Sequence, residues 1–212
     1  PYSEGRHEIR YYSVDRADNA EAERKLELFL DKSPPKVEEA SPSGKFFSNS
    51  RTIFIIVDAA DSSGVREIEL AIDGVPHGFM VKEGDRYIKT VSLSEGGHSW
   101  SIRLTDNLNN SEVCSYSFTL ILDTKPPVIK GLSGPSNPVF GEAATITCTV
   151  FDEPSGVRNV YLCYSTDKGA SWVRTVMSLQ EGLYKGSIPS QFFFTEVQYY
   201  VEAVDNAGNR FQ

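Results

Sequence analysis

The stretch Leu120-Ile121-Leu122-Asp123-Thr124-Lys125-Pro126-Pro127 decides the architecture of this chain, because it occurs twice. The earlier copy is Leu28-Phe29-Leu30-Asp31-Lys32-Ser33-Pro34-Pro35, which lies 92 residues before it. The same spacing relates Ser63-Gly64-Val65-Arg66 to Ser155-Gly156-Val157-Arg158. Self-similarity at a fixed spacing indicates repeated structural units, so we expect an array of similar domains.

A shorter signal, an Asp followed four positions later by an Asn, occurs three times. The pairs are Asp15 and Asn19, Asp106 and Asn110, and Asp205 and Asn209. In such a turn the Asp side chain can accept main-chain N–H bonds, and Asn or Gly tolerates a positive φ. We therefore expect a turn between two strands at each pair.

The repeat spacing predicts three segments. Residues 34–125 and 126–212 each span one full unit, whereas residues 1–33 match only the last third of a unit. We expect two complete domains preceded by the carboxy-terminal hairpin of a truncated one, and we interpret the chain as a fragment of a longer array. Pro-Pro after Asp fixes φ and removes hydrogen-bond donors, so each junction should be short and extended.

Apolar residues alternate with other residues in most segments, which indicates strands. The alternation is clear at Ile53, Ile55 and Val57, and turn residues interrupt the chain every eight to twelve positions, as in β-sandwiches. Residues 20–30 are rich in helix formers, but Leu26, Leu28 and Leu30 alternate, so we predict a strand there. The predicted fold class is all-β, with tandem immunoglobulin-like β-sandwiches preceded by the last hairpin of an incomplete sandwich.

Composition excludes two classes of partner. The chain has 29 acidic and 21 basic residues and a formal net charge of −8, which gives no counterion-release contribution to nucleic-acid binding. No apolar run approaches the roughly 18 residues of a membrane helix, so we expect no membrane insertion. Apolar residues make up 40% of the chain, enough to form packed cores.

Two loops and one strand end carry a family resemblance. The loops are Asp61-Ser62-Ser63-Gly64-Val65 and Asp152-Glu153-Pro154-Ser155-Gly156-Val157, and the strand end is Tyr199-Tyr200-Val201-Glu202-Ala203-Val204-Asp205-Asn206-Ala207-Gly208-Asn209. The chain resembles the immunoglobulin-like and fibronectin type III-like repeats of prokaryotic cell-surface and secreted proteins. The resemblance implies an extracellular location and a structural or adhesive role, as spacer, stalk or interaction module. Asp106-Asn107-Leu108-Asn109-Asn110 departs from the Ala-Gly-Asn ending usual in that family.

No catalytic constellation is present in the sequence, and we expect no enzymatic activity. The only histidines are His7, His77 and His98, of which the first and third occupy equivalent repeat positions. Cys148 and Cys163 should not form a disulfide, because their parity places Cys148 on an inward face and Cys163 on an outward one.

We expect no cofactor, and calcium is the one metal that the sequence makes a candidate. Hard oxygen ligands between β-sandwiches could bind Ca²⁺, although the same residues could simply form turns and keep the surface charged. One group near a junction is Asp15, Asp18, Asn19 and Asp31, and the next is Asp106, Asn110 and Asp123.

Three apolar side chains are candidates for an interaction surface. Phe54 and Ile56 alternate with the core positions and should face outwards, and Trp172 follows a hairpin turn. The expected partners are neighbouring domains or other copies of the chain, with a glycan or another surface protein as further candidates. Two other functions remain open, an accessory or carbohydrate-binding region of an extracellular hydrolase and a self-assembling surface-layer or filament subunit.

Overall fold

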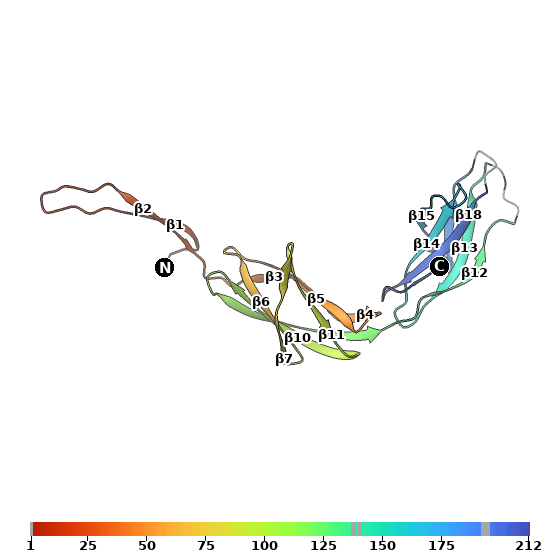
Figure 1. Ribbon diagram of the computed structural model, residues 1–212, viewed down its shortest axis with the longest axis horizontal. Helices are drawn as coiled ribbons and strands as arrows, with labels where there is room; N and C mark the ends of the chain where they lie inside the picture. Colours follow the sequence, from red (N-terminus) through yellow and green to blue (C-terminus); the bar gives the residue numbers. More distant parts are fainter. Residues whose placement is uncertain (1, 137–138, 140, 192–195) are drawn as a thin grey trace. The chain divides into compact units, whose positions relative to one another are not determined.

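The computed structural model describes residues 2–136, 139, 141–191 and 196–212 (Figure 1). Across these ranges the named elements of secondary structure are all β-strands, which confirms the all-β prediction. The segment rich in helix formers contains strand β2 (Arg24–Leu30), because its alternating leucines suit a two-faced strand. No helix among the described residues is long and apolar enough to span a bilayer.

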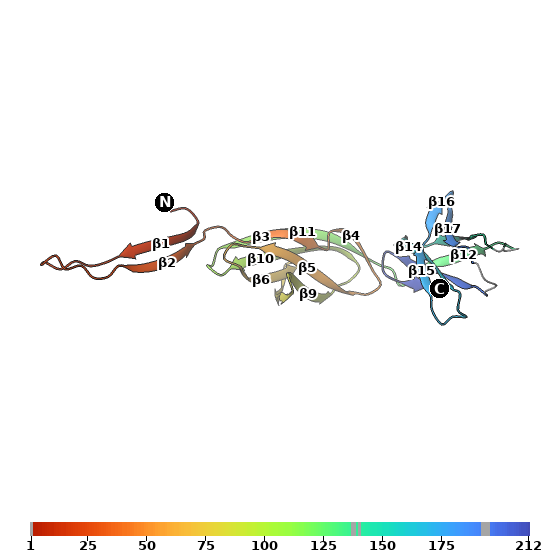
Figure 2. The ribbon, with the colours of Figure 1, turned by 90° about the horizontal axis from the view of Figure 1, so that it is seen from above.

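The first element is a hairpin of two antiparallel strands, shown in red in Figures 1 and 2. Strand β1 (Gly5–Tyr11) pairs with β2 in a register that runs from Gly5 opposite Leu30 to Tyr11 opposite Arg24. The two strands form a sheet of their own.

The middle of the chain forms two sheets. One has the strand order β4-β11-β10-β6-β7, and its strands are β4 (Gly44–Ser48), β6 (Val65–Ile72), β7 (Val75–Phe79), β10 (Gly96–Asp106) and β11 (Ser111–Leu122). The other has the order β3-β5-β9-β8, and its strands are β3 (Lys36–Ser41), β5 (Thr52–Ala60), β8 (Val81–Glu83) and β9 (Arg86–Ser92).

Side chains from both of these sheets are buried, as expected for a sandwich. Two polar groups link the layers: the Tyr87 hydroxyl donates to the carbonyl of Val65 at 3.1 Å, and Trp100 Nε1 donates to the carbonyl of Pro42 at 3.2 Å. Trp100 is 2% exposed, so it belongs to the core. Buried apolar residues of this core include Ile55, Val57, Ile68, Leu70, Ile72, Tyr87, Ile102 and Leu104.

The last part of the chain forms a second pair of sheets. The order β12-β13-β17-β16 joins β12 (Val128–Ser133), β13 (Ala144–Phe151), β16 (Ser178–Gln180) and β17 (Leu183–Ile188). The order β15-β14-β18-β19 joins β14 (Val157–Ser165), β15 (Val173–Val176), β18 (Gln198–Asp205) and β19 (Arg210–Phe211). The core between them contains Ile146, Cys148, Val160, Leu162, Met177, Val201 and Ala203.

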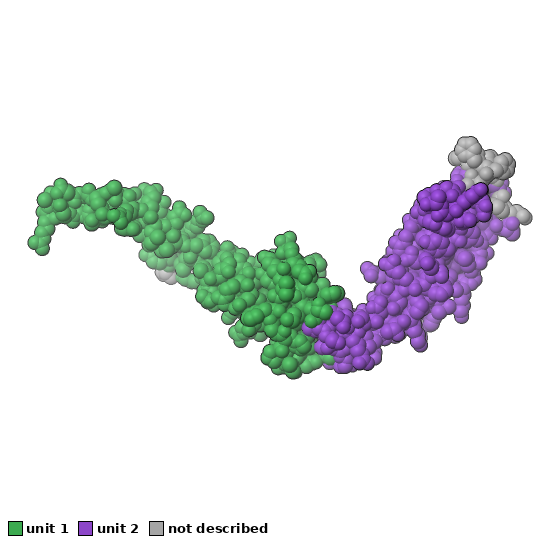
Figure 3. All heavy atoms as spheres, viewed as in Figure 1, with its two compact units in different colours: residues 1–43, 54–90, 98–117 green, residues 44–53, 91–97, 118–212 purple. Residues whose placement is uncertain are grey.

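The chain divides into two compact units, coloured in Figure 3. Unit 1 comprises residues 1–43, 54–90 and 98–117, and unit 2 comprises residues 44–53, 91–97 and 118–212. Strands β5, β9, β10 and β11 have residues in both units. The domain limits 1–33, 34–125 and 126–212 therefore stay a prediction from the repeat spacing.

Candidate functional site: aspartate clusters after strands β2 and β11

Two groups of three aspartates bring carboxylates close together in the described residues, and most of these side chains are buried. The Asp31 cluster contains Asp31, Asp61 and Asp106, and the Asp123 cluster contains Asp123, Asp152 and Asp205. Within each cluster one oxygen of every carboxylate lies within 4.8 Å of the others. Burying charged groups so close together is costly without partners, so their hydrogen bonds must account for them.

Asp31 follows strand β2 and is held by its side chain and its main chain. The hydroxyl of Ser62, in the β5–β6 loop, donates to Asp31 Oδ2 at 2.8 Å, and the N–H of Ser33 donates to Oδ1 at 3.1 Å. The side-chain amide of Asn110 donates to the Asp31 carbonyl at 3.2 Å. Asp31 is thus connected to two loops of the following sandwich.

Asp106, at the end of β10, is fully buried and organises the turn before β11. Its Oδ1 accepts the N–H groups of Leu108 and Asn110, both at 2.8 Å. Its Oδ2 accepts the side-chain amide of Asn110 at 2.7 Å. The turn therefore orients the same amide that reaches Asp31.

Asp123, which follows β11, has an equivalent arrangement in the second cluster. The N–H of Ser155 donates to Asp123 Oδ2 and the N–H of Lys125 to Oδ1, both at 3.1 Å. The side-chain amide of Asn209 donates to the Asp123 carbonyl at 2.8 Å and to Asp205 Oδ2 at 2.7 Å. Asp152 accepts the Ser155 hydroxyl at 3.0 Å.

The Ser-Gly loops are joined to the Asp-x-x-x-Asn turns by a second asparagine. Asn107 Nδ2 donates to the Ser63 carbonyl at 2.6 Å, and Asn206 Nδ2 donates to the Ser155 carbonyl at 2.8 Å. Gly64 has φ +90°, and a Cβ there would lie 2.9 Å from Asn107 Nδ2. The close approach of loop and turn explains why glycine occupies this position.

The turn that departs from the family pattern keeps the same geometry. The N–H of Asp106 donates to the carbonyl of Asn110 at 3.1 Å, as that of Asp205 does to Asn209 at 3.2 Å. Asn109 has φ 70° where the other turn has Gly208 with φ 93°. Asparagine tolerates this left-handed conformation, so the substitution preserves the turn.

The structure separates two sets of residues that the sequence analysis grouped together. Asp15, Asp18 and Asn19 lie in the loop between β1 and β2, where Asn19 Nδ2 donates to Asp15 Oδ2 at 2.8 Å. Asp31 follows β2 at the opposite end of the hairpin, so at least the length of that strand, about 23 Å at the usual rise per residue, separates it from the loop. Asp123 likewise lies with Asp152 and Asp205 rather than with Asp106 and Asn110.

Sequence reasoning overlooked Asp61, Asp152 and Asp205 as members of the clusters. Asp61 and Asp152 precede the Ser-Gly loops, and Asp205 starts the third Asp-x-x-x-Asn motif. These aspartates recur beside repeated motifs, and that recurrence was the sequence signal that could have identified them as cluster members. What the sequence could not show is which loops meet.

Hydrogen bonds and burial shift the pKa values of Asp31, Asp123 and Asp152. A hydrogen bond from Ser62 lowers the pKa of Asp31. Burial acts to raise the pKa of Asp123, but hydrogen bonds from Ser155 and Lys125 outweigh it and the pKa is lowered. Burial, followed by repulsion from Asp123 and Asp205, raises the pKa of Asp152 despite its bond from Ser155.

Carboxylate oxygens are ligands that Ca²⁺ accepts, so each aspartate cluster could contribute three ligands to a cation. The asparagines, however, present N–H donors to the clusters: Asn110 to Asp106 and Asp31, and Asn209 to Asp205 and Asp123. An N–H donor does not coordinate a cation. In the described contacts, the aspartate carboxylates accept hydrogen bonds from protein groups.

The predicted interaction residues lie at two places, Phe54 and Ile56 on one face of β5 and Trp172 before β15. Phe54 on β5 is 58% exposed, as expected for an outward position, and Ile56 is half-buried. Trp172 precedes β15, is 43% exposed, and packs against Tyr200 with 4.9 Å between ring centroids. Each remains a candidate for contact with a partner.

The outer face of β14 is more covered than the sequence predicted. Cys163 was expected to face outwards, and it is 2% exposed, because Arg174 and Tyr200 on the neighbouring strands lie opposite it. The Arg174 guanidinium lies 3.4 Å from the Tyr161 ring centroid and donates two bonds of 3.1 Å to Glu202. The three cysteines are free thiols, so Cys148 and Cys163 are not bonded to each other.

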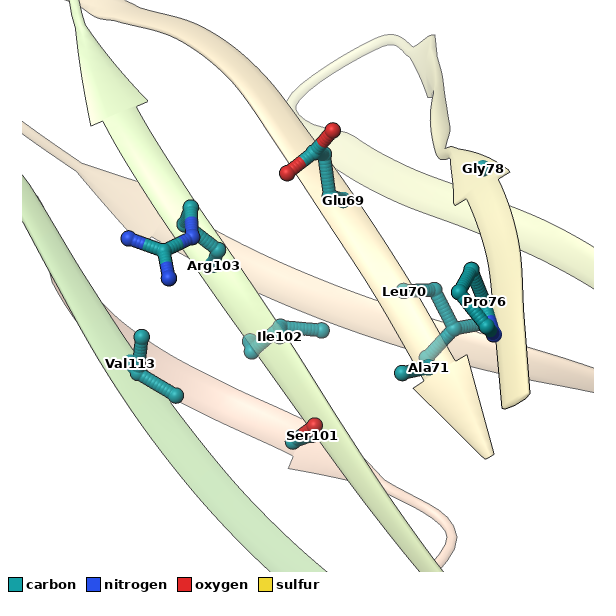
Figure 4. A pocket seen from close by; sticks show the side chains of 9 residues that line it. All are labelled: Glu69, Leu70, Ala71, Pro76, Gly78, Ser101, Ile102, Arg103 and Val113. Atoms are coloured by element: carbon teal, nitrogen blue, oxygen red, sulfur yellow. The ribbon is translucent and has the colours of Figure 1, made fainter. Parts of the chain in front are cut away.

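Among the described residues, neither the contacts of His98 nor the lining of a surface groove has catalytic geometry. His98 Nδ1 lies 2.7 Å from Asp73 Oδ2, and the same carboxylate accepts the N–H of Ser99 at 2.8 Å, so this pair braces a turn. A groove of about 310 Å³ crosses strands β6, β7 and β10 (Figure 4). Its lining includes Glu69, Pro76, Ser101, Arg103 and Val113, with no histidine or cysteine.

Comparison with protein-family models gives no match, and comparison with curated proteins gives none either. Among solved structures, the FN1–FN3 domains of chicken CNTN1 share 14% identity at a TM-score of 0.59, over 96% of this chain and 71% of that one. The fold is that of tandem fibronectin III-like and immunoglobulin-like repeats. The fibronectin(III)-like modules of Clostridium thermocellum CbhA share 13% identity at a TM-score of 0.54, over 83% of this chain and 88% of that one. At such identities the similarity concerns the fold alone.

Proposed function

We propose that this chain is a non-enzymatic structural region of a cell-surface or secreted protein, in which tandem repeats act as a spacer or stalk and carry interaction surfaces. The observation that supports the proposal best is the hydrogen-bonded connection made by Asp31 and repeated by Asp123. In both, the residue after the last strand of one repeat is bonded to loops of the next.

These bonds restrict the junction because they hold both the side chain and the main chain of one residue, Asp123. The carboxylate of Asp123 accepts the Ser155 N–H, and its main-chain carbonyl accepts the Asn209 amide. Pro126 and Pro127 follow three and four residues later and limit φ. A residue held through side chain and main chain, next to a stiff dipeptide, leaves little freedom to rotate, which suits a spacer that holds its repeats in order.

The remaining features support a passive role. The described histidine contacts brace turns, and the groove on strands β6, β7 and β10 has no nucleophile paired with a base. The junction bonds described above join protein groups, and the proposal includes no cofactor. An extracellular, prokaryotic setting is part of the proposal, following the resemblance in the sequence. The partners are neighbouring repeats or other copies, with Phe54, Ile56 and Trp172 as contact residues.

Residual dipolar couplings measured on the two full repeats test the spacer role. A spacer predicts one relative orientation that fits the couplings of both repeats in the wild type. Combining Asp123→Ala with Asn209→Ala should reduce the alignment of one repeat relative to the other. Asp167→Ala is the matched control, because Asp167 caps a turn within the β14–β15 connection and accepts the Ser171 N–H at 2.8 Å. Independent alignment of the repeats in the wild type would contradict the proposal.

A carbohydrate-binding role is the second candidate, and the exposed Trp172 is the observation that favours it. Aromatic rings can stack on sugars, and Tyr200 lies beside Trp172. Affinity electrophoresis of the wild type and Trp172→Ala in gels containing soluble polysaccharides separates the two functions. Our proposal predicts no retardation that depends on Trp172. Retardation of the wild type alone would favour the carbohydrate-binding role.

Self-assembly into a surface layer or filament is the third candidate. Light scattering across protein concentrations tests it, because a spacer keeps a constant mass, whereas a lattice-forming subunit grows. Phe54→Ser removes the most exposed apolar side chain of strand β5 and should abolish growth if that surface mediates assembly.

A further inference from the structure

The β1–β2 hairpin has one apolar face and one charged face. The apolar face carries Ile9 and Tyr11 from β1 with Leu26 and Leu28 from β2, and these four side chains are 45–48% exposed. The opposite, charged face carries one apolar side chain, Phe29, which is 44% exposed, beside cross-strand ion pairs, Arg6 with Glu27 at 3.8 Å and Lys25 with Glu8 at 3.4 Å. Charges suit the solvent, so the apolar face is the one that requires cover.

The same positions are buried in the equivalent hairpin of the next repeat. Ile9 corresponds to Trp100, and Leu28 corresponds to Leu120. Their exposures are 46% and 45% in β1–β2, against 2% and 0% in β10–β11. A face with the same pattern is therefore completely covered elsewhere in this chain.

Local details confirm that the two hairpins are equivalent. Gly5 has φ 116°, and the corresponding Gly96 has φ 130°. Glu4 Oε1 accepts the Lys32 N–H at 2.9 Å, and the corresponding Glu95 Oε1 accepts at 3.3 Å the N–H of Leu122, the counterpart of Leu30. In both hairpins the glutamate before the first strand thus bonds to the main chain near the end of the second, two residues apart in register.

The edges of the hairpin also lack the neighbours that their counterparts have. Strand β10 pairs with β6, and residues Phe118–Leu122 of β11 pair in parallel with Gly44–Ser48 of β4. Among the described residues, β1 and β2 pair only with each other. A two-stranded sheet with two free edges and an uncovered apolar face is at best marginally stable in water.

We propose that an upstream segment of the same polypeptide completes a sandwich on the β1–β2 hairpin. We expect this segment to resemble residues 34–95. One of its sheets would place alternating Ile and Val side chains over Ile9 and Leu28, and strands like β4 and β6 would pair with the free edges of the hairpin. The connection after the hairpin favours this occupant over a second copy. Asp31 is bonded to the following sandwich as Asp123 is, so the hairpin occupies the place in the array that β10–β11 occupies one repeat later.

This inference rests on the proposed array of repeats but is tested separately from it. Residues 34–95 are duplicated and joined to Gly5, so that Glu95 takes the place of Glu4 ahead of the full remaining chain. Hydrogen exchange of the β1 and β2 amides is compared with that of the 212-residue chain. We expect exchange to slow by at least about 100-fold in the extended chain, approaching that of buried strands. Introducing Leu28→Asp into the extended chain should abolish the protection.

A second extended variant controls for the possibility that the duplicated segment packs poorly on the β1–β2 side chains. Ile9→Trp combined with Leu26→Phe restores, in the extended chain, the side chains that residues 34–95 contact in their own repeat. Protection in either extended chain supports the inference, and its absence from both would overturn it. Protection of the hairpin in a monomeric 212-residue chain, or a dimer that Leu28→Asp dissociates in sedimentation, would also overturn it. None of these results bears on the junction at Asp123, so the spacer proposal can survive this failure.

Discussion

The side-chain amide of Asn209 donates a 2.8 Å hydrogen bond to the main-chain carbonyl of Asp123, a residue 86 positions earlier in the chain. The same amide donates to Asp205 within its own turn, so one side chain orders a turn and connects it to the segment after β11. Asn110 makes the corresponding bond to Asp31, at 3.2 Å. A contact formed twice at equivalent positions is a property of the repeat.

Asn209→Ala should destabilise the last sandwich by about 1 to 3 kcal/mol, because it removes a donor and leaves a buried Asp205 oxygen without it. Asn110→Ala should have a similar effect on the middle sandwich. The matched control is Asn19→Ala, whose side chain makes the same bond to Asp15 on an exposed turn with no second carbonyl. Urea denaturation followed by intrinsic fluorescence measures the three variants. An equal loss in Asn19→Ala would show that the turn, not the junction, carries the stability.

The Asp123 cluster should give two opposite dependences of stability on pH. The folded-state pKa of Asp152 is raised, so its contribution is favourable at low pH and lost as pH rises through that pKa. The folded-state pKa of Asp123 is lowered, so its contribution is present above the ordinary aspartate pKa and lost as pH falls through the folded value.

Asp152→Asn isolates the first of these dependences. The amide oxygen can still accept the Ser155 hydroxyl, while the repulsion from Asp123 and Asp205 is removed. The variant should melt at a higher temperature than the wild type at pH 7, and the difference should shrink in acid, where wild-type Asp152 is protonated. Thermal melts from pH 3 to pH 7 measure this. A variant less stable than the wild type at pH 7 would show that the Asp152 charge is needed.

Calcium should have no specific effect on stability, since the junction donors are protein N–H and O–H groups. Melting temperatures in millimolar Ca²⁺ and in EDTA are expected to agree, with Mg²⁺ at the same concentration as the ionic-strength control. A ligand that binds only the folded state raises stability by mass action. A Ca²⁺-specific rise that Asp61→Asn or Asp152→Asn removes would therefore show that an aspartate cluster binds the ion.

The strands could be predicted from sequence, but the partners of the polar residues could not. Leu26, Leu28 and Leu30 identify β2 because alternation reports which face of a strand a residue occupies. Parity does not report what covers that face, which is why Cys163 was expected to be exposed although Arg174 and Tyr200 lie opposite it. The turn of Asp15 was predicted from local spacing, whereas its grouping with Asp31 failed because the hairpin places them at opposite ends.

Hydrogen exchange at the Ser155 amide tests the central claim most directly, because this N–H donates to Asp123 Oδ2. In the wild type the amide should exchange slowly, in step with its neighbours in the Ser-Gly loop. In Asp123→Ala it should exchange at least about tenfold faster, while amides of the β13–β17 pairing keep their protection. Unchanged protection of Ser155 in Asp123→Ala, with the sandwich intact, would contradict the claim that Asp123 connects the end of one repeat to the loops of the next.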